Sequence, residues 1–128
     1  MNANLDTIIL YVRDVEKLRS FYIGVFKLEV VEEYQSIWVL LKAGKGKIGL
    51  HKIGSQYLDK NKEEKFKINS NTKIVFETDE DINKARARLL RQKVAIREIK
   101  TFDNYDYWLC DGEDPEGNVF QLKQKKKV

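Results

Sequence analysis

The chain has 128 residues, of which 42% are hydrophobic and 34% are charged, as in an ordinary soluble globular domain. No apolar run approaches the length that spans a bilayer, and no charged and then apolar N-terminus resembles a secretory signal. These features exclude the interpretation that the chain spans a membrane. We expect a cytoplasmic protein with no membrane partner.

The formal net charge of +4 comes from the C-terminal segment, because the other residues sum to zero. The four positive charges there belong to Lys123, Lys125, Lys126 and Lys127. We expect residues 124–128 to form a solvated basic tail. The sequence near residues 84–93 is also basic, but no stacking aromatics interleave with its charges. Nucleic acid is therefore not the expected partner, and it is kept only as a third alternative.

Cysteine and histidine are each present once, which limits the chemistry of the chain. The single Cys110 excludes an intrachain disulfide framework. A zinc site of the usual kind draws on several His and Cys side chains, whereas this chain offers one of each. A Cys-His nucleophile would need Cys110 beside His51, and we instead expect Cys110 to be a buried structural thiol.

The first half of the chain predicts a strand, a helix and further strands. Alternating apolar residues from Thr7 are typical of a strand, and Asp14 is suited to cap the N-terminus of a helix. The helix itself is indicated by the spacing of Val15, Leu18, Tyr22 and Val25. The later segment "IWVLLKAGKGKIGLHKIG" reads as two strands joined by a turn that contains Gly. A polar, lysine-rich stretch at about residues 54–71 then predicts a connector, with a short helical piece within it.

The second half repeats this pattern. A strand is predicted from Lys73, a helix cap at Asp81, and a helix by the spacing of Ile82, Ala85 and Leu89. The segment "YWLCDGEDPEGNVFQLKQ" then pairs with the later segment of the first half, and we align Trp108 with Trp38. The sequence therefore predicts an α+β chain with two βαβββ modules, at about residues 5–53 and 72–123. We expect one domain over residues 1–128, with curved mixed sheets around a shared cavity.

Three stretches carry a resemblance to a known family: "ILYVRDVEKLRSFYIGVFKLEV", "IVFETDEDINKARARLLRQKV" and "DPEGNVFQL". From about Leu5 to Leu122 the chain resembles the vicinal oxygen chelate superfamily, also called glyoxalase/bleomycin-resistance/dioxygenase proteins. The resemblance implies the tandem βαβββ fold, often a dimer, and a ligand cavity in each curved sheet. Many members also hold one divalent metal through His, Glu or Gln side chains of the first and last strand of each module.

The metal-ligand positions of the family fall on residues that bind metals poorly. By resemblance they are Thr7, Gly49, Lys73 and Gln121. Glycine offers no side-chain ligand, an ammonium group repels a divalent ion, and Thr and Gln are weak neutral donors. We therefore expect no metal cofactor. The family also tends to place a Gly after each helix, where this chain has Lys27 and Lys93.

One alternative keeps a metal. His51 lies two residues after Gly49 and so shares its strand face. A divalent metal near His51 and Gln121, with a carboxylate such as Glu77, would make the chain a lyase or a dioxygenase-like enzyme. A single His without a neighbouring carboxylate is a poor transition-metal site, so we favour a cavity-wall or rim role for His51.

The remaining candidates are polar strand residues and aromatic side chains. Lys73 is suited to anchor a ligand carboxylate or phosphate by charge, or else it reaches solvent. Glu77 shares its face and suits a partner of Lys73, a rim residue or a general base. Gln121 can orient an amide or carbonyl. Flat rings on a curved sheet suit a planar ligand, although core packing is their commoner use. The rings in question are those of Trp38, Phe102, Tyr105, Tyr107 and Trp108.

The sequence thus favours a metal-independent protein that binds a planar or apolar small molecule, with resistance or sequestration as one role. We expect a homodimer. The pattern assigns no catalytic residue, and the metal-dependent enzyme is the alternative. The predicted ligand-binding residues are Thr7, Trp38, His51, Lys73, Glu77, Tyr105, Trp108 and Gln121.

Overall fold

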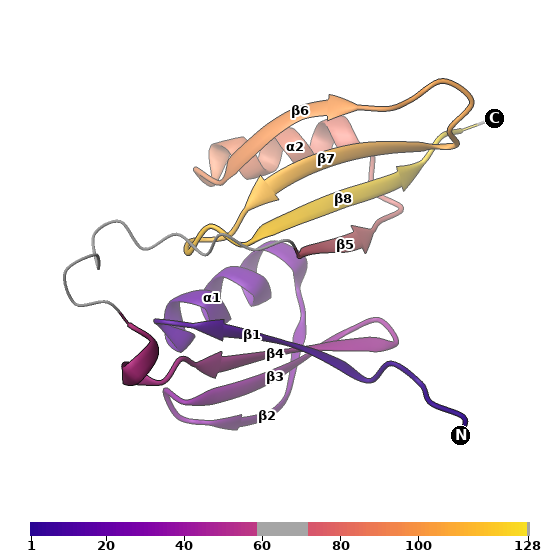
Figure 1. Ribbon diagram of the computed structural model, residues 1–128. Helices are drawn as coiled ribbons and strands as arrows, with labels where there is room; N and C mark the ends of the chain where they lie inside the picture. Colours follow the sequence, from indigo (N-terminus) through magenta and orange to yellow (C-terminus); the bar gives the residue numbers. More distant parts are fainter. Residues whose placement is uncertain (59–71, 128) are drawn as a thin grey trace. The chain divides into compact units, whose positions relative to one another are not determined.

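The computed structural model describes residues 1–58 and 72–127 and divides into two compact units, residues 1–66 and 67–128 (Figure 1). Within these described residues, each unit contains one α-helix and one four-stranded sheet. Most of the predicted connector, residues 59–71, lies outside the described residues. Its first residues form a short 3-10 helix, η1 (Ser55–Tyr57).

Unit 1 has a mixed sheet in the order β1-β4-β3-β2. Strand β1 runs parallel to β4, and the other pairs are antiparallel. The elements are β1 (Thr7–Val12), α1 (Val15–Phe26), β2 (Glu29–Tyr34), β3 (Trp38–Ala43) and β4 (Gly46–Lys52).

Unit 2 repeats this topology in the order β5-β8-β7-β6, with β5 parallel to β8. Its elements are β5 (Lys73–Glu77), α2 (Ile82–Arg91), β6 (Ala95–Lys100), β7 (Tyr107–Glu113) and β8 (Val119–Lys125). The prediction of two tandem βαβββ modules is confirmed. Strand β8 runs to Lys125, so the first two residues of the expected basic tail belong to this strand.

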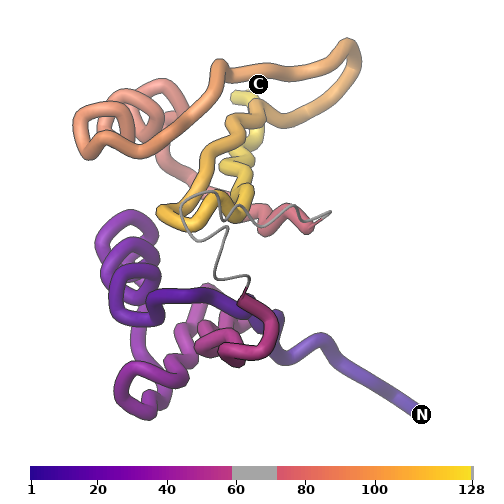
Figure 2. Tube along the Cα trace, turned by 60° about the vertical axis from the view of Figure 1, so that its left-hand side comes forward, coloured from indigo at the N-terminus to yellow at the C-terminus, as the bar shows by residue number. Residues whose placement is uncertain are grey.

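In each unit the helix covers one face of its sheet and forms the core there (Figures 1 and 2). Helix α1 buries Leu18 and Tyr22, and the strands of unit 1 bury Leu41 and Leu50. In unit 2 the buried residues include Ile82, Leu89, Cys110 and Phe120. We call the opposite side of each sheet, which no helix of that unit covers, the open face.

The helix ends follow the sequence signals. Asp14 accepts a hydrogen bond from the backbone N–H of Lys17, and Asp81 accepts from those of Asn83 and Lys84. Both predicted N-caps are therefore confirmed. After the helices, Lys27 and Lys93 have φ of 55° and 61°, in the left-handed region that glycine favours. Within the described residues, every helix is too short or too polar to span a lipid bilayer.

Candidate functional site

The open face of unit 1 carries a row of rings across three adjacent strands. Tyr11 on β1 pairs with His51 on β4, which in turn pairs with Trp38 on β3. The His51 ring centroid lies 5.4 Å from that of Tyr11 and 6.0 Å from that of Trp38. The Tyr11 side chain is exposed, and the other two are half-buried. The sheet register therefore brings the predicted residues Trp38 and His51 together and adds Tyr11, which the sequence analysis did not select.

The indole of Trp38 lies over Gly49. A Cβ atom placed on Gly49 would lie 2.6 Å from Cζ3 of that ring and 3.3 Å from Cγ1 of Ile9. Non-bonded carbon atoms are in optimal contact at about 3.5–4.0 Å, so any side chain at position 49 would displace the ring. The ring thus occupies the space where the family resemblance would place a metal-binding carboxylate.

Polar contacts fix the orientation of these rings. The indole Nε1 of Trp38 donates a hydrogen bond of 3.1 Å to Glu32 on β2. An irregularity between Val30 and Glu32 adds one residue to β2 and sets Glu32 opposite Leu40, on the open face. The Nδ1 of His51 lies 2.7 Å from the carbonyl oxygen of Lys52. A carbonyl only accepts, so Nδ1 donates this hydrogen bond.

Thr7 belongs to a separate polar group at the start of β1. Its hydroxyl donates to Asp6 at 2.6 Å, and Lys47 donates to the other carboxylate oxygen at 2.8 Å. The hydrogen bond from Lys47 is the main reason that the pKa of Asp6 is lowered. Thr7 is therefore already engaged with its neighbour on the chain.

The open face of unit 2 is centred on a buried carboxylate, Asp111 of β7. Lys73 donates to its Oδ2 at 2.9 Å, and the amide of Gln121 donates to its Oδ1 at 2.9 Å. Lys100 and Arg97 follow at 3.5 and 3.8 Å from Oδ2. The predicted residues Lys73 and Gln121 are thus brought together by a residue that the sequence analysis missed.

Asp111 stays ionised in this setting. Burial by itself raises its pKa, but the hydrogen bonds from Lys73 and Gln121 outweigh burial, so the pKa is lowered. One sequence signal pointed to Asp111, because it directly follows the apolar segment "YWLC" of a predicted strand. In the structure Asp111 pairs directly with Gln121. A carboxylate inside a strand that is buried on both sides needs partners.

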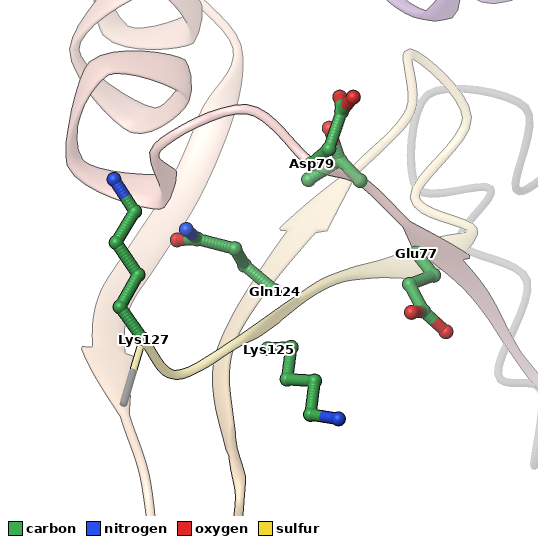
Figure 3. Close-up of a pocket in the computed structure, with 6 residues that line it drawn as sticks. Glu77, Asp79, Gln124, Lys125 and Lys127 are labelled. Atoms are coloured by element: carbon green, nitrogen blue, oxygen red, sulfur yellow. The ribbon is translucent and has the colours of Figure 1, made fainter.

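Glu77 lies at the end of β5, where a hollow of about 520 Å³ opens at the end of the sheet. Its lining is Glu77, Thr78, Asp79, Gln124, Lys125 and Lys127. Figure 3 shows Gln124 and Lys127 extending toward the helix side and Glu77 and Lys125 extending away from it. The Gln124 carbonyl accepts from the backbone N–H of Ile82, so this residue ties β8 to the start of α2. Lys73 pairs with Asp111 rather than with Glu77.

Trp108 and Tyr105 lie apart from the Asp111 group. Trp108 pairs with Gln124 and so points to the opposite face of β7 from Asp111, where Lys126 stands 4.8 Å from its ring centroid. Trp38 and Leu109 occupy equivalent positions in the two sheets. Trp38 pairs with His51 of β4, and Leu109 pairs with Lys123, the equivalent residue of β8. The alignment of Trp38 with Trp108 is therefore one residue out of phase. Tyr105 precedes β7, with its ring centroid 5.6 Å from that of Tyr107.

Cys110 is a buried thiol on the helix side of unit 2. It donates to the carbonyl oxygen of Arg97 at 3.3 Å. Burial is the main cause that raises the pKa of the thiol. A nucleophilic cysteine needs the opposite shift, so this geometry does not activate Cys110.

The family resemblance raises the question of a divalent metal, and the residues at the corresponding positions do not fit one. In unit 1 Thr7 is engaged with Asp6, and Gly49 lies under an indole ring. In unit 2 Lys73 places an ammonium group beside Asp111, and Gln121 turns its amide nitrogen toward the same carboxylate. Over residues 1–58 and 72–127, no group of three or more His, Cys, Asp or Glu side chains is placed to hold a metal ion.

Topology and open faces together define a tandem βαβββ protein with two chemically different sheet surfaces. The sequence pattern of the Glyoxalase/Bleomycin resistance protein/Dioxygenase superfamily matches residues 4–122. The chain belongs to this superfamily, as the resemblance in its sequence indicated. No curated protein matches the chain.

Solved structures share the fold at low sequence identity. Lactoylglutathione lyase from Agrobacterium tumefaciens has a TM-score of 0.74 and 20% identity, covering 97% of this chain and 95% of that chain. A fosfomycin resistance protein from Listeria monocytogenes has a TM-score of 0.77 and 15% identity, covering 98% and 96%. An antibiotic binding protein from a Streptomyces species has a TM-score of 0.73 and 19% identity, covering 98% of each chain. These similarities establish the fold alone.

Proposed function

We propose that this protein binds a planar or apolar small molecule without a metal ion, on the ring-bearing open face of unit 1. Resistance to, or sequestration of, a toxic compound is the role that this activity would serve. The observation that carries the proposal is the Trp38 ring over Gly49, since it replaces a possible ligand carboxylate with a flat apolar surface.

The contacts around Trp38 support a binding role rather than simple core packing. The hydrogen bond to Glu32 holds the indole plane, so little rotamer entropy remains to be lost when a ligand stacks on it. Tyr11 is 55% exposed, which is unusual for a ring that only fills a core. Offset stacking on such rings is worth about 1 kcal/mol beyond the burial of area. One of the structural neighbours is described as an antibiotic binding protein, which agrees with this role.

Fluorescence titration tests the proposal directly. The chain has two tryptophans, so a Trp108→Phe background leaves Trp38 as the single indole reporter. A neutral planar probe such as acridone should quench Trp38 emission in a saturable way. Tyr11→Leu should weaken the affinity about tenfold, because one stacking partner is lost. The matched control is Phe102→Leu, an exposed ring on unit 2, which should leave the affinity unchanged.

Metal analysis tests the second half of the proposal. Protein purified under native conditions should contain less than stoichiometric Fe, Mn, Ni or Zn, and its Tm should not change with a chelator. Stoichiometric metal that is lost together with thermal stability would replace this proposal by the metal-dependent lyase or dioxygenase-like alternative. Acridone binding that Tyr11→Leu leaves unchanged would remove unit 1 as the site.

The remaining expectations are part of the same proposal. We propose that the two units act as one domain of a cytoplasmic protein, and that the chain forms a homodimer, as the superfamily resemblance implies. Light scattering coupled to gel filtration measures the mass in solution, and a monomeric mass at micromolar concentration would contradict the dimer.

A further inference from the structure

The open face of unit 2 is charged, whereas that of unit 1 is aromatic. We infer that the open face of unit 2 recognises an oxyanion, that is, a carboxylate or phosphate group carried by a small molecule. The groups that would bind it are Lys73, Arg97 and Lys100, gathered around Asp111. The inference goes beyond the proposed function, because it concerns a separate site on the other unit.

The charges on this face do not balance. Three cationic side chains lie within 3.8 Å of the single carboxylate of Asp111. Glu113 is the other acid in the group, 3.6 Å from Arg97, so one positive charge is left over. Lys123 projects from the same face of β8 but stands opposite Glu77 of β5, so the excess stays at one positive charge. An excess of positive charge at one place on a sheet attracts an anion.

The cations also keep hydrogen-bond donors to spare. Lys73 makes the single short bond to Asp111 Oδ2, whereas Lys100 and Arg97 approach that atom only at 3.5 and 3.8 Å. An ammonium group has three N–H donors and a guanidinium has five, so most of them are not used by Asp111. The side chains are 40%, 56% and 47% exposed for Lys73, Arg97 and Lys100, which leaves them accessible to a ligand.

Two features show that this cluster is held in place. The Asp111 side chain is only 7% exposed, so the carboxylate that gathers the cations is fixed in the sheet. Strand β6 also carries an irregularity between Ile96 and Ile99, where two residues stand opposite Asp111 alone. This bulge lets Arg97 reach toward Asp111 and Glu113, while Glu98 pairs with Arg86 of α2. Bulges commonly redirect a side chain in this way beside binding sites.

The surroundings suit an anion with an apolar body. Val75 pairs with Gln121 on the same face and is 48% exposed. The Tyr107 ring lies on this face as well, with Lys123 Nζ 4.1 Å from its centroid. An aromatic carboxylate would place its ring on these apolar groups and its charge on the cations. Hydrogen bonds between charged partners are stronger than those between neutral groups.

Calorimetric titration with matched probes tests the inference. Benzoate and inorganic phosphate should bind, and benzamide, which has the shape of benzoate without its charge, should bind at least tenfold more weakly than benzoate. Arg97→Gln and Lys100→Gln should each weaken benzoate binding about tenfold, and higher NaCl should weaken it further. Arg91→Gln, an equal loss of charge on the exposed end of α2, should leave the affinity unchanged.

Three results would overturn the inference. One is equal affinity for benzoate and benzamide, and another is full benzoate affinity in the Arg97→Gln/Lys100→Gln double variant. The third is binding of a single-stranded oligonucleotide through these residues while neither benzoate nor phosphate binds. None of them touches the proposed function, which stands or falls with acridone binding to Trp38. Circular dichroism of each variant separates lost affinity from lost folding.

Discussion

The two units share one topology but carry opposite chemistry on their open faces. At corresponding points of the sheet register, unit 1 has Gly49 beside Leu40, whereas unit 2 has Gln121 beside Asp111. The first face is aromatic and apolar, and the second is a network of charges. The fold therefore constrains the helix side of each sheet, while the open side is free to diverge.

The edge strands show how small the structural difference is. Both β2 and β6 carry an irregularity at the corresponding place, and each directs a charged side chain over its open face. In unit 1 this side chain is Glu32, which holds the Trp38 indole. In unit 2 it is Arg97, which approaches Asp111. The same kind of edge-strand irregularity thus supports an aromatic surface in unit 1 and a cationic surface in unit 2.

The largest expected effect comes from two glycines that lie under aromatic rings. A Cβ on Gly112 would lie within 3.0 Å of three ring carbons of Phe120, which is fully buried and has no room to move. Gly112→Ala should lower the free energy of unfolding by about 3 kcal/mol. At Gly49 the half-buried Trp38 can swing toward solvent, so Gly49→Ala should cost only about 1 kcal/mol. Urea unfolding of both variants measures the difference.

Gly24 provides the control for this pair. It lies within α1, and a Cβ there meets no atom within 4 Å. Gly24→Ala should raise the free energy of unfolding by about 1 kcal/mol through helix propensity. Gly49→Ala should also abolish the acridone response of Trp38. Equal costs at positions 49 and 112 would contradict the view that the half-buried Trp38 ring can be displaced toward solvent and the buried Phe120 ring cannot.

A smaller effect is expected when the centre of unit 2 is neutralised. Asp111→Asn keeps the shape of the side chain but removes the charge that pairs with Lys73. We expect a loss of about 1–2 kcal/mol at pH 7, since the lysine partners are half-exposed and can still be hydrated. Unfolding measured at pH 7 gives this value, and Glu98→Gln, an exposed acid of the neighbouring strand β6, should cost less than about 0.5 kcal/mol.

The pH dependence of this variant sharpens the result. The folded protein lowers the pKa of Asp111, so the unfolded chain binds its proton first as the pH falls. Asp111 should therefore contribute its full stabilisation above the ordinary Asp pKa of about 4. That contribution should disappear as the pH falls through the lowered value, and the curves of wild type and Asp111→Asn should converge there. A gap that stays constant down to acid unfolding would show that Asp111 does not act through its charge.

Sequence reasoning captured the fold because its signals are local and repeated. Alternation from Thr7 and Lys73 and the caps at Asp14 and Asp81 recur in both halves, and each element follows from its own residues. The site is different, because it depends on which residues face one another across strands. Asp111 is distant in sequence from Lys73 and acquires its role only through the pairing of β5, β8 and β7.

The Trp38 and Trp108 alignment shows the same limit. Matching one tryptophan to the other ignored the one-residue offset between the modules, and in a strand one residue exchanges the two faces. Trp108 therefore lies on the helix side of its sheet, whereas Trp38 points to the open face. A pattern that fixes which residues form a strand does not fix its phase against the neighbouring strand.

The smallest expected effect concerns the feature that the two units share outside their open faces. Lys27 and Lys93 both follow a helix with positive φ, where a side chain costs roughly 1 kcal/mol and glycine costs none. Glycine loses more entropy on folding, so Lys27→Gly and Lys93→Gly should each stabilise by only about 0.5 kcal/mol. Lys45→Gly, at an exposed turn position outside the left-handed region, is the control and should not stabilise. If Lys27→Gly and Lys93→Gly differ clearly in thermal unfolding, the helix ends are not equivalent, and the divergence of the two units extends beyond their open faces.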